Sequence, residues 1–351
     1  MKRYLIPIIA ALSLASTAFG QAKAKAQNVP EIPYDSVPNF IKLPPGLYLG
    51  EAMGVATNSK GHFFVYTRSA NTRLFEFDQS GKFVREIGEG NYGFEFAHSV
   101  RVDPEDNIWV VDEGTNLVIK FNPAGRIVMV LGHRPDAVAG AVATNPPPPA
   151  QPAQKYIFGR PTDVGWDPQG NIFVSDGYVN NRVVKYDKNG RFLAQAGSEK
   201  AGSEPGQMNL PHGLAVDAQG NVYVADRSNN RMQVFDNNLK LKTVYDNIGT
   251  SWTVCVSPGP HQYLFTSNSN PNGNPPGSWD NTGEIYKMEL DGTIIGKFGH
   301  AGKLPGAFQV VHMMDCRNPN EIFVAEIESW RVQKLLLKPP SGKNAGASAA
   351  R

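Results

Sequence analysis

The chain has 351 residues and a formal net charge of +2 at pH 7, and 41% of its residues are hydrophobic and 19% charged. This ordinary globular composition provides ample apolar material for a core. Because basic and acidic residues are spread along the whole chain, it presents no electrostatic footprint for nucleic acid or an anionic membrane, and we expect neither as a partner. The 35 Gly and 27 Pro residues indicate many turns.

The N-terminus has the pattern of an export signal. Two basic residues precede an apolar stretch over residues 4–15, and Ala18-Phe19-Gly20 suits cleavage after Gly20. We therefore expect residues 1–20 to be a signal peptide and the protein to be secreted or periplasmic. The apolar stretch is too short for a comfortable membrane span, and nothing later in the chain approaches one. Residues 21–37 are expected to form a linker.

The body of the chain repeats a unit whose clearest copy runs from Leu210 to Asp236. Each copy has a short alternating run, a Gly-containing turn, a second run that ends in an acidic residue, and a third run. Such alternation is typical of half-buried strands, and the Asp, Asn and Gly clusters supply the turns. Aligned through their turns, the six copies place equivalent positions at Met53, His98, Thr162, His212, Trp252 and His312. Six such units predict an all-β fold, a six-bladed β-propeller over residues 38–338.

The ends of the repeat array predict how the ring closes. A fourth strand follows each of the first five units, but the sixth unit lacks one. An unpaired strand edge invites aggregation, so another segment should cover it. We expect Asn39–Leu43, which reads NFIKL, to join the sixth blade as an N-terminal strand. Residues 339–351, rich in Pro, Gly, Ala and Ser, are expected to form a disordered tail.

Three long insertions interrupt the repeat, at residues 133–160, 197–210 and 268–281. The first two join a fourth strand to the next first strand, and the third joins strands two and three. In an up-and-down meander these connections emerge on the same face. The connections on the other face are short and uniform. Because long loops on a rigid scaffold are where sites are usually built, we expect a functional site on the elaborated face.

Three of the seven histidines, His98, His212 and His312, occupy the same repeat position in alternate blades. Alternate blades of a six-bladed ring lie about 120° apart, so these side chains should converge on the axis at one height. Three neutral imidazoles around an open fourth position are typical of catalytic zinc, and no carboxylate there favours calcium or magnesium. Any one of them could instead be a turn histidine bonded to backbone, but the coincidence of three favours a metal. The other four, at unrelated repeat positions, are expected at the surface.

The second strands return to the same face. The residues at their ends are Arg68, Glu113, Gly177 with Tyr178, Arg227, Asn268 and Ile327. An Arg can bind a carboxylate with two hydrogen bonds, and a Tyr phenol beside a divalent cation is a plausible proton acceptor. We therefore select Tyr178, Arg68 and Arg227 as candidate catalytic residues. For each arginine, an ion pair between blades is the structural alternative.

Other charged residues recur in most units and are interpreted as structural. The arginines are Arg73, Arg182, Arg231 and Arg331. The aspartates are Asp112, Asp176 and Asp226, which we expect to bond turn backbone. The two cysteines, Cys255 and Cys316, allow either one bridge or two buried thiols. Their offsets within the repeat place them on opposite faces of their strands. In adjacent blades, opposite faces can either confront each other or point apart, so both possibilities stay open.

The repeat resembles the NHL repeat. The segments FAHSV, SDGYVNNRVVKYDKNGRF, LPHGLAVDAQGNVYVADRSNNRMQVF and VVH further resemble peptidyl-α-hydroxyglycine α-amidating lyase, the propeller domain of the peptide-amidating enzyme. The likeness covers roughly residues 53–338. It implies that the three histidines hold Zn²⁺, that Tyr178 is the catalytic base, and that Arg68 orients the substrate with Arg227 nearby. The family reaction splits a small peptide ending in α-hydroxyglycine into a peptide amide and glyoxylate.

The chain departs from this family at three positions. The family's aspartate after the third histidine, a calcium ligand, is Met313 here, the methionine two residues before that histidine is Val310, and the cysteine after the catalytic tyrosine is Val179. Ca²⁺ is therefore doubtful, and the substrate could differ.

Two other functional classes stay open. One is a non-catalytic NHL propeller that binds a protein or cell-envelope ligand. The other is a propeller hydrolase such as a lactonase, although such enzymes usually rely on Ca²⁺ held by carboxylates. In each case we expect a monomer.

Overall fold

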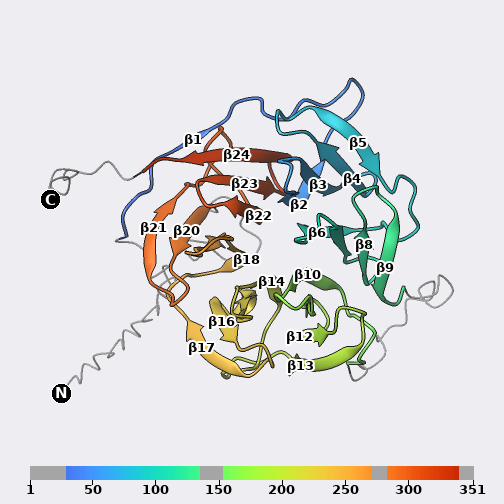
Figure 1. The fold of residues 1–351 in the computed structure, drawn as a ribbon. Helices are drawn as coiled ribbons and strands as arrows, with labels where there is room; N and C mark the ends of the chain where they lie inside the picture. The colour runs from blue at the N-terminus through green and yellow to red at the C-terminus, as the bar shows by residue number, and fades with distance from the viewer. Residues whose placement is uncertain (1–28, 135–152, 270–282, 340–351) are drawn as a thin grey trace, which may run out of the picture.

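Six four-stranded sheets stand around a common centre like the blades of a propeller (Figure 1). The structure is a computed structural model that describes residues 29–134, 153–269 and 283–339. The predicted all-β, six-bladed β-propeller is confirmed. The predicted signal peptide, parts of the first and third insertions, and the predicted tail beyond residue 339 lie outside the described residues.

Within blades one to five, the strands follow chain order from the centre outward. Blade one comprises β2 (Glu51–Thr57), β3 (Phe63–Arg68), β4 (Arg73–Phe77) and β5 (Phe83–Ile87). Blade two comprises β6 (Ala97–Val102), β7 (Ile108–Asp112), β8 (Leu117–Phe121) and β9 (Ile127–Gly132). Blade three comprises β10 (Pro161–Trp166), β11 (Ile172–Asp176), β12 (Asn181–Tyr186) and β13 (Phe192–Ser198).

The remaining blades repeat this order, except that the last one borrows its outer strand from the N-terminus. Blade four comprises β14 (Pro211–Val216), β15 (Val222–Asp226), β16 (Arg231–Phe235) and β17 (Leu241–Tyr245). Blade five comprises β18 (Ser251–Val256), β19 (Leu264–Asn268), β20 (Glu284–Met288) and β21 (Ile294–Phe298). Blade six comprises β22 (Val311–Asn318), β23 (Glu321–Glu326), β24 (Arg331–Leu337) and β1 (Tyr34–Ser36).

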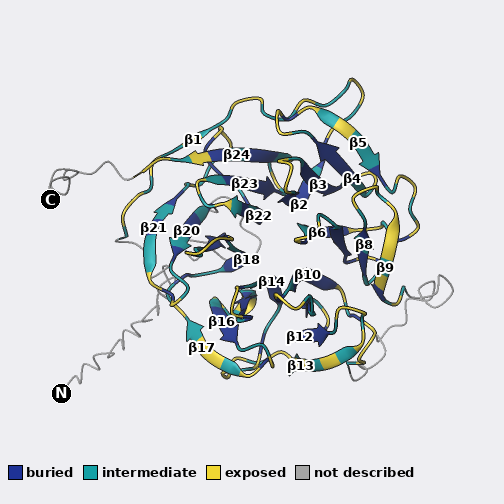
Figure 2. Ribbon diagram, in the orientation of Figure 1, coloured by how far each residue is buried: buried dark blue, intermediate teal, exposed yellow. Residues whose placement is uncertain are grey.

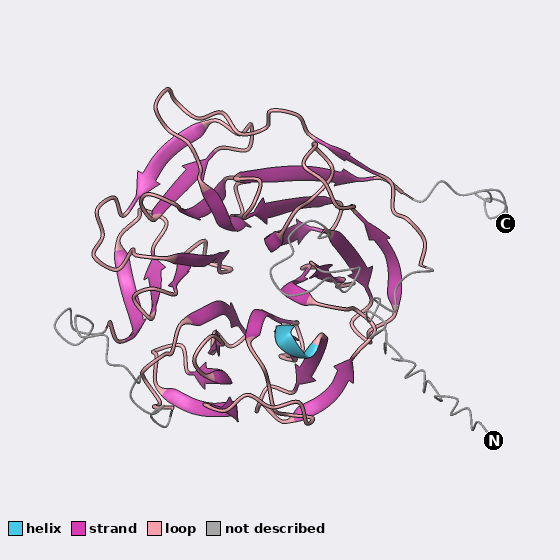
Figure 3. Ribbon diagram, turned by 180° about the vertical axis from the view of Figure 1, so that it is seen from behind, coloured by secondary structure: helices cyan, strands magenta, loops and turns pink. Residues whose placement is uncertain are grey.

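Helix is nearly absent from the described ranges. A 3₁₀ turn, η1 (Arg227–Asn229), follows β15 and is visible from behind in Figure 3. No helix among the described residues is long and apolar enough to cross a membrane.

The core lies between neighbouring blades. Strand β3 shows why: its alternate residues Phe64 and Tyr66 pack with blade two, whereas Phe63 and Val65 pack toward blade six. Because side chains alternate across a strand, each inner strand is buried on both faces. Figure 2 shows dark inner strands, whereas the outermost strands carry exposed residues. Packing between blades therefore holds the first strands in place around the axis.

An N-terminal strand does close the ring, but it is not the expected one. β1 pairs antiparallel with β24, with Tyr34 opposite Leu337. It thus fills the fourth position of blade six (Figure 1). The pairing begins before residue 38, the expected start of the propeller.

The expected strand Asn39–Leu43 has a different role. Lys42 forms an isolated bridge with Lys82 of blade one, and Phe40 stacks on Phe63 with ring centroids 5.2 Å apart. Asn39 has a left-handed φ of 48° and follows a proline, which has no N–H to donate, so regular strand pairing is interrupted there. The apolar residues of this segment cover the outside of the junction between blades one and six.

A disulfide joins Cys255 of β18 to Cys316 of β22. Of the two possibilities that the sequence left open, the structure has the bridge rather than two thiols. The bridge ties the first strands of blades five and six together. The strand faces that carry the two cysteines therefore confront each other.

The recurring arginines and acids act within their blades, as expected. Three arginines pair with the acid that ends the second strand, at 2.7–2.9 Å: Arg182 with Asp176, Arg231 with Asp226, and Arg331 with Glu326. Arg73 instead pairs with Glu86 of the fourth strand. Asp112 accepts hydrogen bonds from the backbone N–H groups of Glu95, Phe96 and Thr115. These residues organise the turns of the scaffold.

Candidate metal centre

The three histidines converge as the repeat predicts. His98, His212 and His312 lie near the start of β6, β14 and β22, the first strands of alternate blades. Each offers one ligand atom, and these atoms lie within 4.8 Å of one another. All three side chains are buried. The ring centroids are 4.6–4.9 Å apart.

Irregular strand pairing accompanies this convergence. At each of the six equivalent repeat positions, the register between strands one and two shifts. A β-bulge turns a side chain out of the regular alternation and frees its carbonyl from the ladder. In blades two, four and six the residue at this position is histidine.

The other three blades supply the groups that fix the imidazoles. Each Nδ1 lies 2.6–2.7 Å from the carbonyl oxygen of the equivalent residue in the next blade: His98 with Thr162, His212 with Trp252, and His312 with Met53. A carbonyl can only accept, so Nδ1 carries the proton and Nε2 keeps its lone pair. Gly213 permits this approach, because a Cβ there would lie 2.8 Å from the Trp252 oxygen.

The electrostatics keep these imidazoles neutral. Burial lowers the pKa of His98 and of His212 well below the ordinary value, and the neighbouring histidines lower it further. Burial likewise lowers the pKa of His312 to about 3. Neutral imidazole is the form that binds a metal. Nε2 of His98 is buried without a hydrogen-bond partner among the described residues. Three fixed neutral nitrogen donors fit Zn²⁺ with an open fourth position.

Two of the three candidate catalytic residues, Tyr178 and Arg227, lie together on the rim of the channel beside the histidines. The hydroxyl of Tyr178 lies 3.5 Å from Nε2 of His212. The charge of Arg227, the first residue of η1, acts on Tyr178, and its guanidinium stacks 3.5 Å from the ring centroid of Trp252. Burial raises the pKa of the Tyr178 phenol, as does the charge of Glu113, whereas Arg227 and other arginines oppose the shift.

Arg68 lies on the same rim and is held on two sides. Its Nε donates to Glu51 at 2.6 Å, within the same blade, and its guanidinium lies 3.7 Å from the ring centroid of Phe96 in the connection to blade two. The alternative of an ion pair between blades is therefore wrong for Arg68. Its charge reaches the site, since it contributes to the lowered pKa of both His98 and His312.

The remaining histidines stand apart from this cluster. His62 pairs with Glu76 and His261 with Glu289. His133 and His300 are exposed. The prediction that only three of the seven form a site is consistent with this placement.

Sequence reasoning assigned no role to two further residues that the structure brings to the site. Glu113 is buried, with one carboxylate oxygen 3.8 Å from Nε2 of His98. Arg160 forms an ion pair with Glu113 and lies 4.9 Å from the ring centroid of Tyr178. The alignment of the repeats did contain a signal for Arg160. It occupies the position that Leu210 fills in blade four, so a charged residue stands where the clearest copy has an apolar one.

Arg101 crosses the axis beyond the histidines. Its Nε donates to Asp163 at 2.9 Å, and its other nitrogens donate to the carbonyls of Met314 and Val254 at 3.0 and 3.2 Å. One nitrogen also lies 3.6 Å from the sulfur of Met313, the residue that replaces the family's calcium ligand. The guanidinium of this blade-two residue thus contacts three other blades, namely three, five and six.

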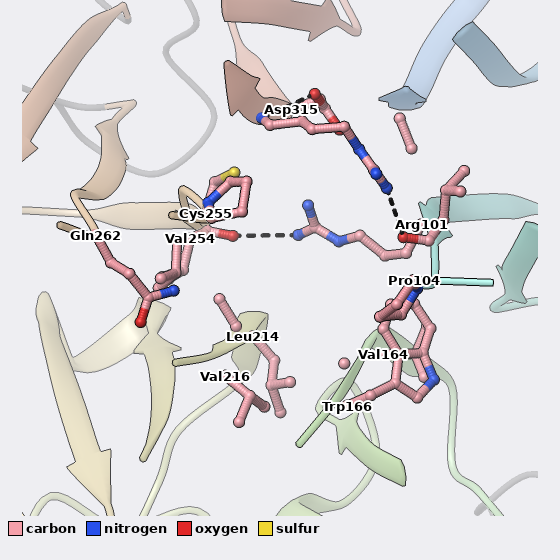
Figure 4. A pocket seen from close by; sticks show the side chains of 17 residues that line it. Arg101, Pro104, Val164, Trp166, Leu214, Val216, Val254, Cys255, Gln262 and Asp315 are labelled. Carbon is pink, nitrogen blue, oxygen red and sulfur yellow. Dashed lines mark hydrogen bonds between the residues drawn. The ribbon is translucent and has the colours of Figure 1, made fainter. Parts of the chain in front are cut away.

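Arg101 also lines a pocket of about 350 Å³ at the other end of the first strands. Figure 4 shows Arg101 reaching across it toward the carbonyl of Val254. Apolar side chains such as Val164, Trp166 and Leu214 form much of its wall. The histidines and this pocket therefore occupy opposite ends of the same strands.

Replacing Arg101 with methionine is expected to lower the free energy of unfolding by about 3–5 kcal/mol, because it leaves the buried Asp163 carboxylate without its cation. Chemical denaturation of the Arg101→Met protein measures the loss. The double variant Arg101→Met/Asp163→Asn should recover much of it, since the amide oxygen can still accept from the N–H of Leu214, which bonds Asp163 at 3.0 Å. Equal losses in both variants would contradict an effect of uncompensated charge.

The fold and the site define a six-bladed β-propeller with a three-histidine centre at one end of its axis. Residues 208–235 match the model of a family described as NHL repeat. The repeat that contains His212 is thus an NHL repeat.

Curated relatives fall into two groups. A mouse peptidyl-glycine alpha-amidating monooxygenase is 31% identical over 56% of this chain and 22% of its own length. A probable peptidyl-alpha-hydroxyglycine alpha-amidating lyase of Caenorhabditis elegans is 29% identical over 54% of this chain and 57% of its own. A mouse NHL repeat-containing protein 3 is 28% identical over 82% of this chain and 80% of its own. The chain spans about a fifth of the length of the mouse monooxygenase.

Solved structures support the fold alone. Virginiamycin B lyase from Staphylococcus aureus superimposes with a TM-score of 0.54, over 88% of this chain and 100% of that one, at 12% identity. The chain is therefore a propeller that resembles amidating lyases in sequence.

Proposed function

We propose that the protein is a secreted, zinc-dependent carbon–nitrogen lyase of the peptidyl-α-hydroxyglycine α-amidating type. It would split an α-hydroxyglycine into an amide and glyoxylate. One observation carries this proposal: three neutral imidazoles, fixed by backbone carbonyls, meet beside the phenol of Tyr178, whose hydroxyl lies 3.5 Å from Nε2 of His212. The similarity to the nematode lyase supports the reaction class.

His98, His212 and His312 would hold the zinc ion through Nε2, because Nδ1 of each is occupied. When bound, zinc would polarise the substrate hydroxyl and lower its pKa. Calcium has no part in the proposal, because Met313 offers sulfur in place of a carboxylate and the Arg101 guanidinium lies against it.

Tyr178 would accept the proton of the substrate hydroxyl. Its phenol lies at the histidine cluster. Burial and the charge of Glu113 raise its pKa, so the phenolate that accepts the proton would depend on the cationic Arg227, Arg68 and Arg160, which favour it, and on the charge of the bound zinc ion. As the proton leaves, the hydroxyl oxygen forms the carbonyl of glyoxylate and the C–N bond breaks. The electron pair of that bond goes to the amide nitrogen, which takes up a proton.

Arg227 and Arg68 would supply the positive charge at the rim. The charge of Arg227 favours the Tyr178 phenolate, and its guanidinium stacks on Trp252. Arg68 is oriented by Glu51 and Phe96 and can bind the substrate carboxylate. The substrate, a small α-hydroxyglycine compound or peptide, would thus lie between the histidines and the rim. We propose that the enzyme acts as a monomer.

Export is part of the proposal. The basic residues and apolar stretch of residues 1–20 support a signal peptide. The bridge between Cys255 and Cys316 suits an oxidising compartment such as the periplasm or the extracellular space.

A non-catalytic propeller that binds a protein or cell-envelope ligand is the second candidate. The similarity to NHL repeat-containing protein 3 favours it, because that relative covers more of the chain than the lyase does and its name states no activity. The Tyr178 and histidine geometry favours the lyase.

Incubation of the purified protein with benzoyl-α-hydroxyglycine is expected to release benzamide and glyoxylate in equal amounts. Glyoxylate is measured colorimetrically and benzamide by chromatography, and zinc is measured on the same sample by atomic spectrometry. Protein without zinc would favour the binding module. Zinc-loaded protein that forms no glyoxylate from this or a peptidyl substrate would mean that the lyase acts on another compound.

A further inference from the structure

Glu113 places an unpaired carboxylate oxygen at the histidine cluster. It directly follows β7, and its side chain is 2% exposed. Its Oε2 is buried with no hydrogen-bond partner among the described residues, and it lies 3.8 Å from Nε2 of His98, which is also without one. A buried carboxylate oxygen and a buried imidazole nitrogen that face each other without a hydrogen bond are costly. A group that interacts with both would remove this cost.

The surrounding structure fixes this orientation. The N–H of Glu113 donates to the carbonyl of Phe96 at 3.0 Å. The other carboxylate oxygen pairs with Arg160, whose side chain is half exposed. Arg160 is itself anchored, because its N–H donates to the side-chain oxygen of Asn116 at 2.8 Å. Oε1 is thus directed toward the rim, and Oε2 toward His98.

The charge balance of the site explains what Oε2 could do. Two guanidinium groups stand beside the imidazoles, those of Arg68, which Glu51 orients, and of Arg227, which stacks on Trp252. The neighbouring Asp112 carboxylate is occupied by backbone N–H groups and by the hydroxyl of Tyr66. Among the residues that the repeat predicted at this rim, Glu113 alone carries a negative charge; the others are Arg68, Gly177, Tyr178, Arg227, Asn268 and Ile327. A divalent cation placed among guanidinium groups gains from an adjacent anion.

We propose that Glu113 is the anionic residue of this metal centre and raises its affinity for a divalent transition-metal ion. The inference rests on the proposed function, in that the three histidines must bind the metal. The cluster of mutually close ligand atoms comprises the histidines alone. Glu113 therefore acts from beside the ligands, as a positioning residue that offsets charge and orients the group at the open position.

Metal affinity tests this role without an assay of activity. The full chain is stripped with a chelator, and Zn²⁺ is titrated in competition with a chromophoric chelator; Co²⁺ absorption spectra report the coordination. Glu113→Gln is expected to weaken Zn²⁺ binding by about 10–100-fold, the usual effect of removing a residue that supports metal ligands. Glu95→Gln removes an exposed carboxylate, paired with Arg134, and should leave the affinity unchanged.

Arg160→Gln separates a metal role from a structural one. If Glu113 only anchors Arg160, both single variants should change metal affinity alike. If Glu113 supports the metal, Arg160→Gln should not weaken binding, because the carboxylate remains and a competing cation is gone. Should Glu113→Gln fold poorly, the double variant Glu113→Gln/Arg160→Gln removes both charges of the pair and is still expected to bind Zn²⁺ weakly.

The outcomes distinguish this inference from the proposed function. Full affinity in Glu113→Gln, alongside lost binding in His98→Ala, would overturn the role of Glu113 and leave the histidine centre intact. A parent protein that binds no Zn²⁺ would overturn the proposed function itself.

Discussion

Replacing His98, His212 and His312 together with alanine is expected to abolish zinc binding and glyoxylate release while the propeller stays folded. The side chains lie near the axis, and each is held through Nδ1 by one backbone carbonyl of the next blade. The cores between blades do not depend on them. Without the three Nε2 donors, no other group of His, Cys, Asp and Glu in the described ranges is close enough to replace them. Atomic spectrometry after gel filtration measures bound zinc, and circular dichroism checks the fold.

His261→Ala provides the matched control. This histidine is 61% exposed and pairs with Glu289 at the surface, so its loss should change neither zinc content nor activity. Zinc that persists at the parent stoichiometry in the triple variant would place the metal elsewhere. It would also make the convergence of the three rings a structural feature.

The repeat made much of this architecture predictable. Alternation and turn residues are local signals, so six similar units indicate six blades. The histidine positions follow from the ring, because equivalent residues of alternate blades must face one another across the axis. Tyr178 and Arg227 were predictable for the same reason, since strand two returns to the face where strand one begins.

Other features depend on contacts that the repeat does not encode. The β-bulges at the six equivalent positions leave no mark in the pattern of apolar residues, yet they free the carbonyls of Thr162, Trp252 and Met53. The closing strand Tyr34–Ser36 is short and weakly patterned, whereas Asn39–Leu43 reads as a better strand but packs across a junction.

The residues of the rim show a further limit. Arg160 and Glu113 come from different blades and meet only once the first insertion returns to β10. Charges scattered through a sequence give no sign of which pairs will be buried together. Here the buried partner of Arg160 also reaches the histidines, since Oε2 of Glu113 lies 3.8 Å from Nε2 of His98.

The fixed tautomer of the histidines links the fold to the proposed chemistry. Because backbone carbonyls of blades one, three and five accept hydrogen bonds from Nδ1, the Nε2 lone pairs of the histidines in blades two, four and six must point to one centre. The same repeat position holds histidine in alternate blades and other residues in the blades between them. Imidazoles and backbone carbonyls therefore alternate around the ring. Loss of the β-bulge in blade one, three or five would remove the carbonyl that accepts from Nδ1 of the histidine in the preceding blade.

Replacing Tyr178 with phenylalanine is expected to lower kcat for α-hydroxyglycine cleavage by about 10²–10⁴-fold, the range that general-base catalysis supplies, with zinc content unchanged. The ring would keep its place beside His98, at a centroid distance of 5.5 Å, and only the hydroxyl that would accept the proton would be lost. Tyr48→Phe, at a residue that is 72% exposed, serves as the control. A parent-like kcat in Tyr178→Phe would assign the proton to another base, and a parallel loss of zinc would make the phenol a structural support of the centre. A lower kcat at full zinc occupancy is the result that identifies Tyr178 as the catalytic residue.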